Sequence, residues 1–135
     1  KEIQIEEMEN RLKVTMVDKI LFNTGQAQVN PRGREVLAKV AASLKNRTSH
    51  AAVVEGHTDN VPIGQGLKNR FASNWELSAA RALSVVRFLQ EKGVDPTRLS
   101  AAAFGPYQPV ASNETAEGRS RNRRIEIILI PAKER

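Results

Sequence analysis

The most informative stretch of this chain is Gly56-His57-Thr58-Asp59-Asn60, followed after a loop by Asn74-Trp75-Glu76-Leu77-Ser78-Ala79-Ala80-Arg81-Ala82. The first segment continues the apolar run 51–55, which is typical of a buried strand. Ser73 and Glu76 have the spacing of a capping box, so a helix is predicted to begin with the second segment. A strand that leads through a loop into a helix predicts an α/β fold.

The flanking segments show the same alternation of strands and helices. Apolar patterns predict the strands, while Asn30 with Pro31 provides a helix start and Gly93 a helix end. The predicted elements are a strand at 12–22 with a turn or bulge at 17–19, a helix from 31 to about 45, a strand at 51–55, a helix from 74 to about 92, a strand at 99–104, a short helix at 117–122 and a strand at 125–130. They predict a two-layer βαβαβ-type sandwich, with two main helices packed on one mixed four-stranded sheet.

The N-terminal segment is charged and places Ile5, Met8 and Leu12 at helical spacing. We predict the end of a helical stalk or linker over residues 1–11, followed by a single domain over residues 12–135. A frayed terminus is the alternative. The chain starts at Lys1 and has no apolar run of the ~20 residues that cross a bilayer, so we expect its address signal and membrane anchor to lie outside it.

Composition narrows the classes of site. The 135 residues include no cysteine, which excludes disulfides and thiolate metal sites. With only two histidines, we expect no metal centre and no cofactor. The net charge of +6 favours an acidic partner, such as cell-wall carboxylates, anionic lipid or nucleic acid.

Asp59 and Arg81 are the candidate ligand-binding residues. Asp59 follows the end of an apolar strand, and Arg81 interrupts the apolar helical row of Leu77, Val85 and Phe88. A charge in an apolar row is costly unless it is paired. Together, a carboxylate and a guanidinium can hold the ammonium and the carboxylate of a zwitterionic amino acid. The alternatives are a turn aspartate, a structural salt bridge elsewhere, or a pair between the two residues.

Two other functions are weaker alternatives. A peptidoglycan hydrolase would use His57 with Asp59 or Glu55, but no serine has a convincing nucleophile elbow around it. A nucleic-acid-binding domain would use the basic run from Arg119 to Arg124. Aromatic residues are only 4% of the chain and none interleaves with that run, so a stacking platform is missing. We expect these arginines on the solvent or sheet-edge side of a helix-to-strand junction.

Short motifs that occur in one order from residue 12 to residue 130 carry a family resemblance. They are Ile20-Leu21-Phe22 with Gly25 and Ala27, Glu55-Gly56-His57-Thr58-Asp59, Asn74 with Leu77-Ser78 and Arg81-Ala82, Arg98-Leu99, Gly105 and Pro109, and Asn113 with Gly118-Arg119 and Asn122-Arg123-Arg124-Ile125-Glu126. In these motifs the chain resembles the OmpA-like C-terminal domain family, the peptidoglycan-binding module of porins, lipoproteins and flagellar stator proteins.

The resemblance implies a βαβαβ-type sandwich that binds peptidoglycan without catalysis. It assigns Asp59 and Arg81 to the diaminopimelate of the stem peptide. The groove around them is expected to include Asn23, Thr24, Gly25, Gln26, Ala27, Thr58, Asn60, Asn74 and Leu77. It also implies a periplasmic domain whose parent protein is attached to the outer or inner membrane, with peptidoglycan rather than nucleic acid as the partner. The oligomeric state stays open, because stator-type members form homodimers and many others do not.

Overall fold

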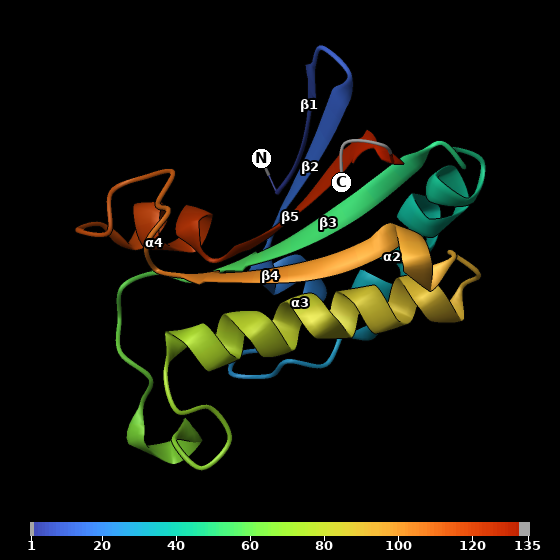
Figure 1. Cartoon of the computed structure of the whole chain (residues 1–135). Helices are drawn as coiled ribbons and strands as arrows, with labels where there is room; N and C mark the ends of the chain where they lie inside the picture. The colour runs from blue at the N-terminus through green and yellow to red at the C-terminus, as the bar shows by residue number, and fades with distance from the viewer. Residues whose placement is uncertain (1, 133–135) are drawn as a thin grey trace.

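One mixed β-sheet forms the first layer of the computed structural model, which describes residues 2–132 (Figure 1). The strands are β1 (Ile3–Met8), β2 (Arg11–Val17), β3 (His50–His57), β4 (Leu99–Gly105) and β5 (Arg124–Pro131). Their order in the sheet is β1-β2-β5-β3-β4. Strands β3 and β4 are parallel, whereas the other neighbouring pairs are antiparallel. The last strand of the sequence, β5, therefore lies in the middle of the sheet.

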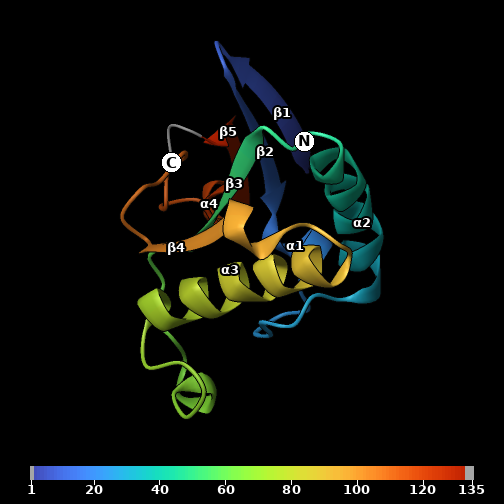
Figure 2. The same cartoon turned by 45° about the vertical axis from the view of Figure 1, so that its right-hand side comes forward.

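Two long helices, α2 (Pro31–Lys45) and α3 (Asn74–Glu91), cover one face of the sheet (Figures 1 and 2). The short helices α1 (Asp18–Leu21) and α4 (Ala116–Asn122) and the 3-10 turns η1 (Gln65–Leu67) and η2 (Pro96–Arg98) lie in the connections. The core lies between the two layers, and its largest fully buried apolar side chains are Met16, Ile20, Leu21, Leu37, Leu44, Val54, Val85, Leu89, Val94, Ile125 and Ile127. The predicted two-layer α/β sandwich is confirmed.

Local capping chemistry explains where the long helices begin. The side chain of Asn30 accepts a hydrogen bond from the backbone N–H of Gly33 at 2.7 Å. Ser73 Oγ accepts one from the N–H of Trp75 at 3.1 Å, and its hydroxyl also donates to the Glu76 carboxylate. Each cap satisfies an N–H group that the first helical turn leaves free. The predicted starts of both helices are confirmed.

The N-terminal half of α3 packs closely against the carboxyl ends of β3 and β4. A Cβ atom on Gly56 would overlap the carbonyl oxygen of Ser78, so a residue without a side chain is needed there. The Ser78 hydroxyl accepts a hydrogen bond from the N–H of Gly105 at 3.1 Å, which ties α3 to the end of β4. Ligand sites of α/β sheets favour this end of the strands.

The prediction of a helical N-terminal segment is wrong. Ile3–Met8 form the edge strand β1, in which Ile5 lies opposite Val14 of β2. A tight turn with Glu9 at a φ of 52° joins the two strands. Ile3 and Ile5 alternate with polar residues, and this period of two matches a strand rather than a helix. The sheet thus has five strands instead of the predicted four.

The predicted strand at Ile20-Leu21-Phe22 is also wrong, because Asp18–Leu21 form the one-turn helix α1. Consecutive residues of a strand point to opposite faces, whereas Ile20 and Leu21 are both fully buried in the same core. The short helix predicted at 117–122 is confirmed as α4. Among residues 2–132, no helix is both long enough and apolar enough to cross a membrane.

Candidate functional site

Four charged side chains of alternating sign, Arg81, Asp18, Arg123 and Asp59, form one connected network. Arg81 Nη1 donates to Asp18 Oδ2 at 2.9 Å, and Arg123 Nε lies 3.6 Å from the same oxygen. Arg123 Nη1 donates to Asp59 Oδ2 at 2.8 Å. We call these residues the four-charge network. Asp59 and Arg81 therefore belong to one cluster, but each is paired with another residue and not with its predicted counterpart.

Asp59 lies two residues beyond the end of β3 and is 7% exposed. Its Oδ1 accepts a hydrogen bond from the N–H of Val61 at 3.0 Å, so the turn aspartate considered from the sequence is present. The Asn74 side chain donates to the carbonyl oxygens of Asp59 and Val61, and the Thr58 hydroxyl donates to the Asp59 carbonyl. One carboxylate oxygen of Asp59 thus accepts from the backbone, and the other accepts from Arg123.

Arg81 projects from α3 and is 6% exposed. Besides its bond to Asp18, its Nε donates to the carbonyl oxygen of Gln26 at 2.9 Å, and its guanidinium carbon lies 4.7 Å from the ring centre of Phe22. Burial lowers the pKa of Arg81 from its ordinary value, while the Asp18 carboxylate opposes this shift. An arginine has so high an ordinary pKa that the side chain stays charged. The structure therefore holds a fixed cation beneath the loop 23–29.

The predicted groove residues reach the pair to different degrees. Hydrogen bonds link Gln26 to Arg81, and Thr58 and Asn74 to Asp59. Asn23 is one step removed, because its carbonyl oxygen accepts from the N–H of Gln26. The remaining groove residues are Thr24, Gly25, Ala27, Asn60 and Leu77. Within residues 2–132, no side chain of these residues forms a direct hydrogen bond or ion pair with Asp59 or Arg81, and Gly25 has no side chain.

Sequence reasoning missed Asp18 and Arg123. Asp18 was assigned to a turn or bulge, and Arg123 to a basic run on the solvent or sheet-edge side. The predicted solvent-side position is wrong for Arg124, which is buried and bonds to Glu126 at 2.6 Å, whereas the Arg123 side chain is 38% exposed. Arg119 donates to the carbonyl oxygen of Asn113. Three of the four arginines in the run therefore bond within the domain, which weakens the case for a nucleic-acid surface.

His57 lies in a second polar cluster on the sheet. Its Nε2 is 3.0 Å from Glu55 Oε1, and its ring stacks on Phe104 with 5.0 Å between the centres. Glu55, His57 and Glu126 offer ligand atoms within 4.8 Å of one another, so they are the residues that could hold a metal ion. Arg124 and Lys13 already balance the charge of Glu126, at 2.6 and 3.8 Å. This pairing leaves little negative charge for a cation.

The serines considered as nucleophiles from the sequence do not bond to His57. The Ser78 hydroxyl donates to the carbonyl oxygen of Trp75, and the Ser73 hydroxyl donates to Glu76. His57 Nδ1 is buried without a hydrogen-bond partner in the described part of the chain. Neither Ser73 nor Ser78 is therefore activated by His57 as a nucleophile for acyl transfer.

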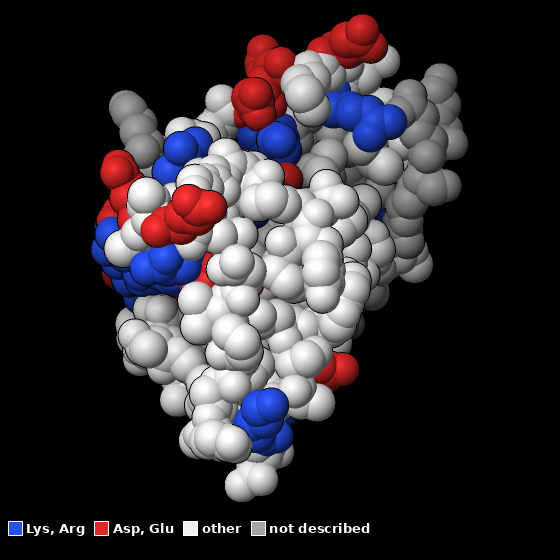
Figure 3. Space-filling view, turned by 90° about the vertical axis from the view of Figure 1, so that its left-hand side faces the viewer, with Lys and Arg blue, Asp and Glu red and all other residues white. Residues whose placement is uncertain are grey.

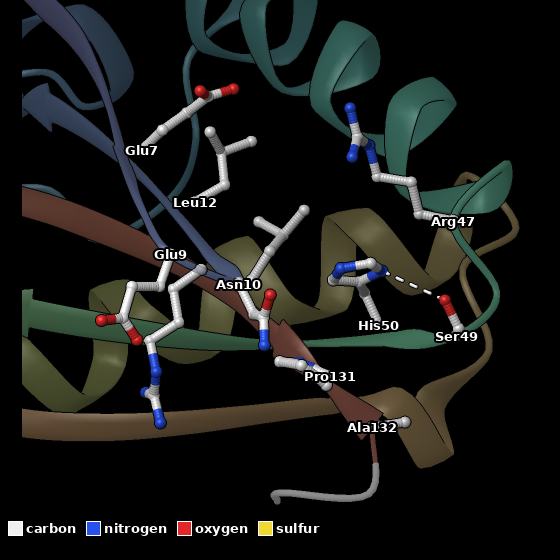
Figure 4. Close-up of a pocket in the computed structure, with 11 residues that line it drawn as sticks. Glu7, Glu9, Asn10, Leu12, Arg47, Ser49, His50, Pro131 and Ala132 are labelled. Carbon is white, nitrogen blue, oxygen red and sulfur yellow. Dashed lines mark hydrogen bonds between the residues drawn. The ribbon is translucent and has the colours of Figure 1, made fainter.

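The cavities of the surface differ in their relation to the network. An open concavity of about 800 Å³ lies by the β1–β2 turn and the end of α2 (Figure 4). Its side chains, including Glu9, Asn10, Arg47 and His50, come from separate elements and none belongs to the four-charge network. A smaller pocket of about 260 Å³ includes Asn60 and Asn74, which adjoin Asp59. Another pocket, of about 520 Å³, includes Ala27, so both of these pockets contain residues of the predicted groove.

Comparisons with known proteins place this geometry in a family. The OmpA family model matches residues 21–123. Motility protein B of Bacillus subtilis is 38% identical over 121 residues, which cover 89% of this chain and 45% of that protein. The cell wall anchor of the T6SS from Pseudomonas aeruginosa has a TM-score of 0.86 and 35% identity, over 96% of this chain and 88% of that chain. The periplasmic domain of Helicobacter pylori MotB has a TM-score of 0.86 and 27% identity, over 96% and 82%.

The chain spans about half the length of the curated relatives it matches. It is thus comparable to one domain of those proteins rather than to the whole of each. The family match includes strand β3, which ends before Asp59, and helix α3, which carries Arg81, and its last residue is Arg123; Asp18 lies just outside it. Both the sequence match and the shared fold lead to the same assignment: the chain belongs to the OmpA family.

Proposed function

We propose that this domain binds peptidoglycan without catalysis and attaches its parent protein to the cell wall. The similarity to a cell wall anchor and to a periplasmic MotB domain supports this function. The parent protein would be membrane-anchored through a segment outside this chain and would present the domain to the periplasm. Domains of this family are non-catalytic modules.

We propose further that the ligand is the diaminopimelate of the stem peptide. The free end of diaminopimelate carries an ammonium and a carboxylate on one carbon. Asp59 would bind the ammonium and Arg81 the carboxylate, because hydrogen bonds between charged groups are the strong ones. Arg81 uses Nε and Nη1 in the described contacts, so Nη2 remains to bind the ligand.

Ligand binding would exchange one ion pair for another. The Arg123 side chain is 38% exposed, whereas that of Asp59 is 10% exposed. Arg123 is thus the partner that can move away, and the ligand ammonium would take its place on Asp59. Because the exchange replaces an existing pair, the net gain is small, and a single domain should bind weakly. Many domains on one polymer would raise the overall affinity through avidity.

The single observation that carries the proposal is the four-charge network, which connects the buried residues Asp59 and Arg81 from separate elements. The test is an NMR titration with a stem peptide that contains diaminopimelate and, separately, with the same peptide that has lysine in its place. The side chain of peptide-bound lysine has an ammonium but no neighbouring carboxylate, and an unmatched charge costs about 1–3 kcal/mol, so the diaminopimelate peptide should bind at least ~10-fold more tightly. The amides of residues 23–29, 58–60 and 80–82 should shift. Equal affinities, or shifts confined to residues 119–124, would refute the proposed ligand.

A further inference from the structure

Two aromatic side chains lie exposed beside the proposed site. Trp75 is 45% exposed and Tyr107 is 63% exposed, and their ring centres are 5.1 Å apart with 35° between the planes. Trp75 belongs to the first turn of α3, and Tyr107 to the loop after β4. Aromatic residues make up only 4% of the chain, so it is unusual that two of them lie side by side on the surface. We call Trp75 and Tyr107 the aromatic platform.

The scaffold under the aromatic platform is fixed. Both rings pack over Gly105, where a Cβ atom would lie 3.5 Å from Trp75 Cδ2 and 3.6 Å from Tyr107 Cδ2. Gly105 has a φ of 58° and donates its N–H to Ser78 Oγ. The backbone of Trp75 is held by the cap of Ser73. The rings therefore need little ordering when a ligand binds, which favours binding.

The pocket beside the platform has a mixed polar and apolar lining and is almost uncharged. Its lining comprises Asn60, Pro62, Ile63, Lys68, Ala72, Ser73, Asn74, Trp75, Pro106 and Tyr107, of which Lys68 is the one charged residue. In Figure 3, which views the side with the start of α3, the η1 loop and the loop after β4, charged side chains lie toward the edges and a broad uncharged surface occupies the centre. Such a surface suits a neutral ligand better than a polyanion, which needs several cations.

The platform is continuous with the proposed diaminopimelate site. Asn60 follows Asp59 in the chain and lines the pocket. Asn74 precedes Trp75 and donates to the carbonyl oxygen of Asp59. A ligand whose charged end lies at Asp59 and Arg81 can thus continue over Asn60 and Asn74 onto the two rings. In peptidoglycan, the group at the other end of the stem peptide is a sugar.

We infer that the aromatic platform binds an N-acetylated hexopyranose of the glycan strand; this rests on the peptidoglycan binding proposed above. The C–H face of a pyranose ring is apolar and can stack on Trp75 and Tyr107, while its hydroxyl and acetamido groups can bond to amide and hydroxyl groups such as those of Asn60 and Ser73. Tryptophan and tyrosine combine an apolar ring with a polar N–H or O–H group, so they can contact both the apolar and the polar parts of a sugar. The domain then recognises sugar and peptide together.

The test compares three ligands by calorimetry: a stem peptide that ends in diaminopimelate, the same peptide on its disaccharide, and the disaccharide alone. The wild-type domain should bind the glycopeptide roughly 2- to 10-fold more tightly than the peptide, the range that stacking of aromatic groups provides. Trp75→Ala and Tyr107→Ala should abolish this difference and leave peptide affinity unchanged, while Trp75→Phe should retain part of it. Trp75 is the single tryptophan, so its fluorescence should also change with the glycopeptide.

Leu83→Ala is the matched control, because Leu83 is an exposed apolar residue of the same helix outside this pocket. It should keep the wild-type difference, and thermal melts should show that all variants are folded. Equal wild-type affinities for peptide and glycopeptide would overturn the inference. Loss of peptide binding in Trp75→Ala would also overturn it, because the ring would then serve the peptide. If the peptide fails to bind but the disaccharide binds and requires Trp75, the proposed diaminopimelate site fails while the aromatic platform stands.

Discussion

Arg123 donates a hydrogen bond from Nη1 to Asp59 Oδ2 at 2.8 Å. The carboxylate that is proposed to bind the ligand is thus already paired with an arginine of the same chain. The two residues are 64 positions apart in the sequence. A ligand ammonium must therefore compete with an internal guanidinium at this position. Removing the Arg123 side chain should therefore raise the affinity of the domain for the ligand.

Arg123→Ala should increase the affinity for diaminopimelate, because the variant removes the internal competitor of the ligand ammonium. The Arg123 side chain is 38% exposed, so solvent screens the pair and its loss should lower the free energy of unfolding by only about 1 kcal/mol. Calorimetry measures the affinity and urea denaturation the stability. Arg121→Ala, at an exposed position of the same run, is the control. A fall in affinity with Arg123→Ala alone would mean that Arg123 itself binds the ligand.

Arg81→Lys should reduce binding to purified sacculi by at least ~10-fold, nearly as much as Arg81→Ala or Asp59→Ala. Lysine keeps the positive charge but lacks the planar guanidinium, whose separate N–H groups can bond to Asp18, Gln26 and a ligand carboxylate at the same time. Co-sedimentation measures the effect. Arg87→Ala, an exposed arginine of the same helix, should bind normally. Near-normal binding by Arg81→Lys would show that only the charge matters.

Arg81→Ala should also destabilise the domain. The variant leaves the Asp18 carboxylate, whose side chain is 16% exposed, with only the longer 3.6 Å contact to Arg123. A part-buried group that loses its partner costs about 1–3 kcal/mol. Urea denaturation should show this loss, and Asp18→Asn combined with Arg81→Ala should recover part of it. Full stability of Arg81→Ala would indicate that the pair contributes nothing.

Gly56→Ala should destabilise the domain by roughly 1–3 kcal/mol or prevent folding, because the new methyl group would overlap the Ser78 backbone carbonyl. Backbone atoms cannot move aside as a flexible side chain can. Gly64→Ala is the matched control, since a Cβ atom there meets open space. Thermal melts should separate the two variants. Equal melting temperatures would mean that α3 does not lie as close to β3 as described.

Ser73→Ala should raise the pKa of Glu76, because the hydrogen bond from Ser73 is the main cause that lowers this pKa in the folded domain. A lowered folded-state pKa contributes stability above the unfolded pKa of Glu76, and this contribution is lost as the pH falls through the folded value. The difference in melting temperature between wild type and Ser73→Ala should therefore narrow in acid. Titration of the Glu76 side chain by NMR checks the shift, and a difference that stays constant with pH would contradict it.

Sequence patterns predicted the elements that local chemistry specifies. The caps at Asn30 and Ser73 are each completed within three residues, so their helices could be placed without tertiary information. Strand β1 could not be recognised by burial, because all its residues are exposed and its pairing with β2 decides its conformation. Helix α1 begins without a side-chain cap, so nothing local distinguished it from a strand.

The candidate site shows the same division. Asp59 and Arg81 could be selected because each stands out against an apolar pattern in its own element. Asp18 and Arg123 could not, because the pairs they form join residues 63 and 64 positions apart. Arg123 also lies in a run of similar residues, and only the path of the chain decides which arginine reaches Asp59. The tertiary structure therefore determines which residue pairs with a predicted charged residue.

The central place of β5 has a consequence for how the chain folds during synthesis. This strand pairs with both β2 and β3, yet it leaves the ribosome after the other four strands of the sheet. A growing chain that lacks residues 124–131 has no strand to join β2 to β3, so its sheet cannot close. Folding should be one late event in which long-range contacts form together, and such folding is slow. Until then the emerging polypeptide remains unfolded, with its apolar helix faces open to chaperones.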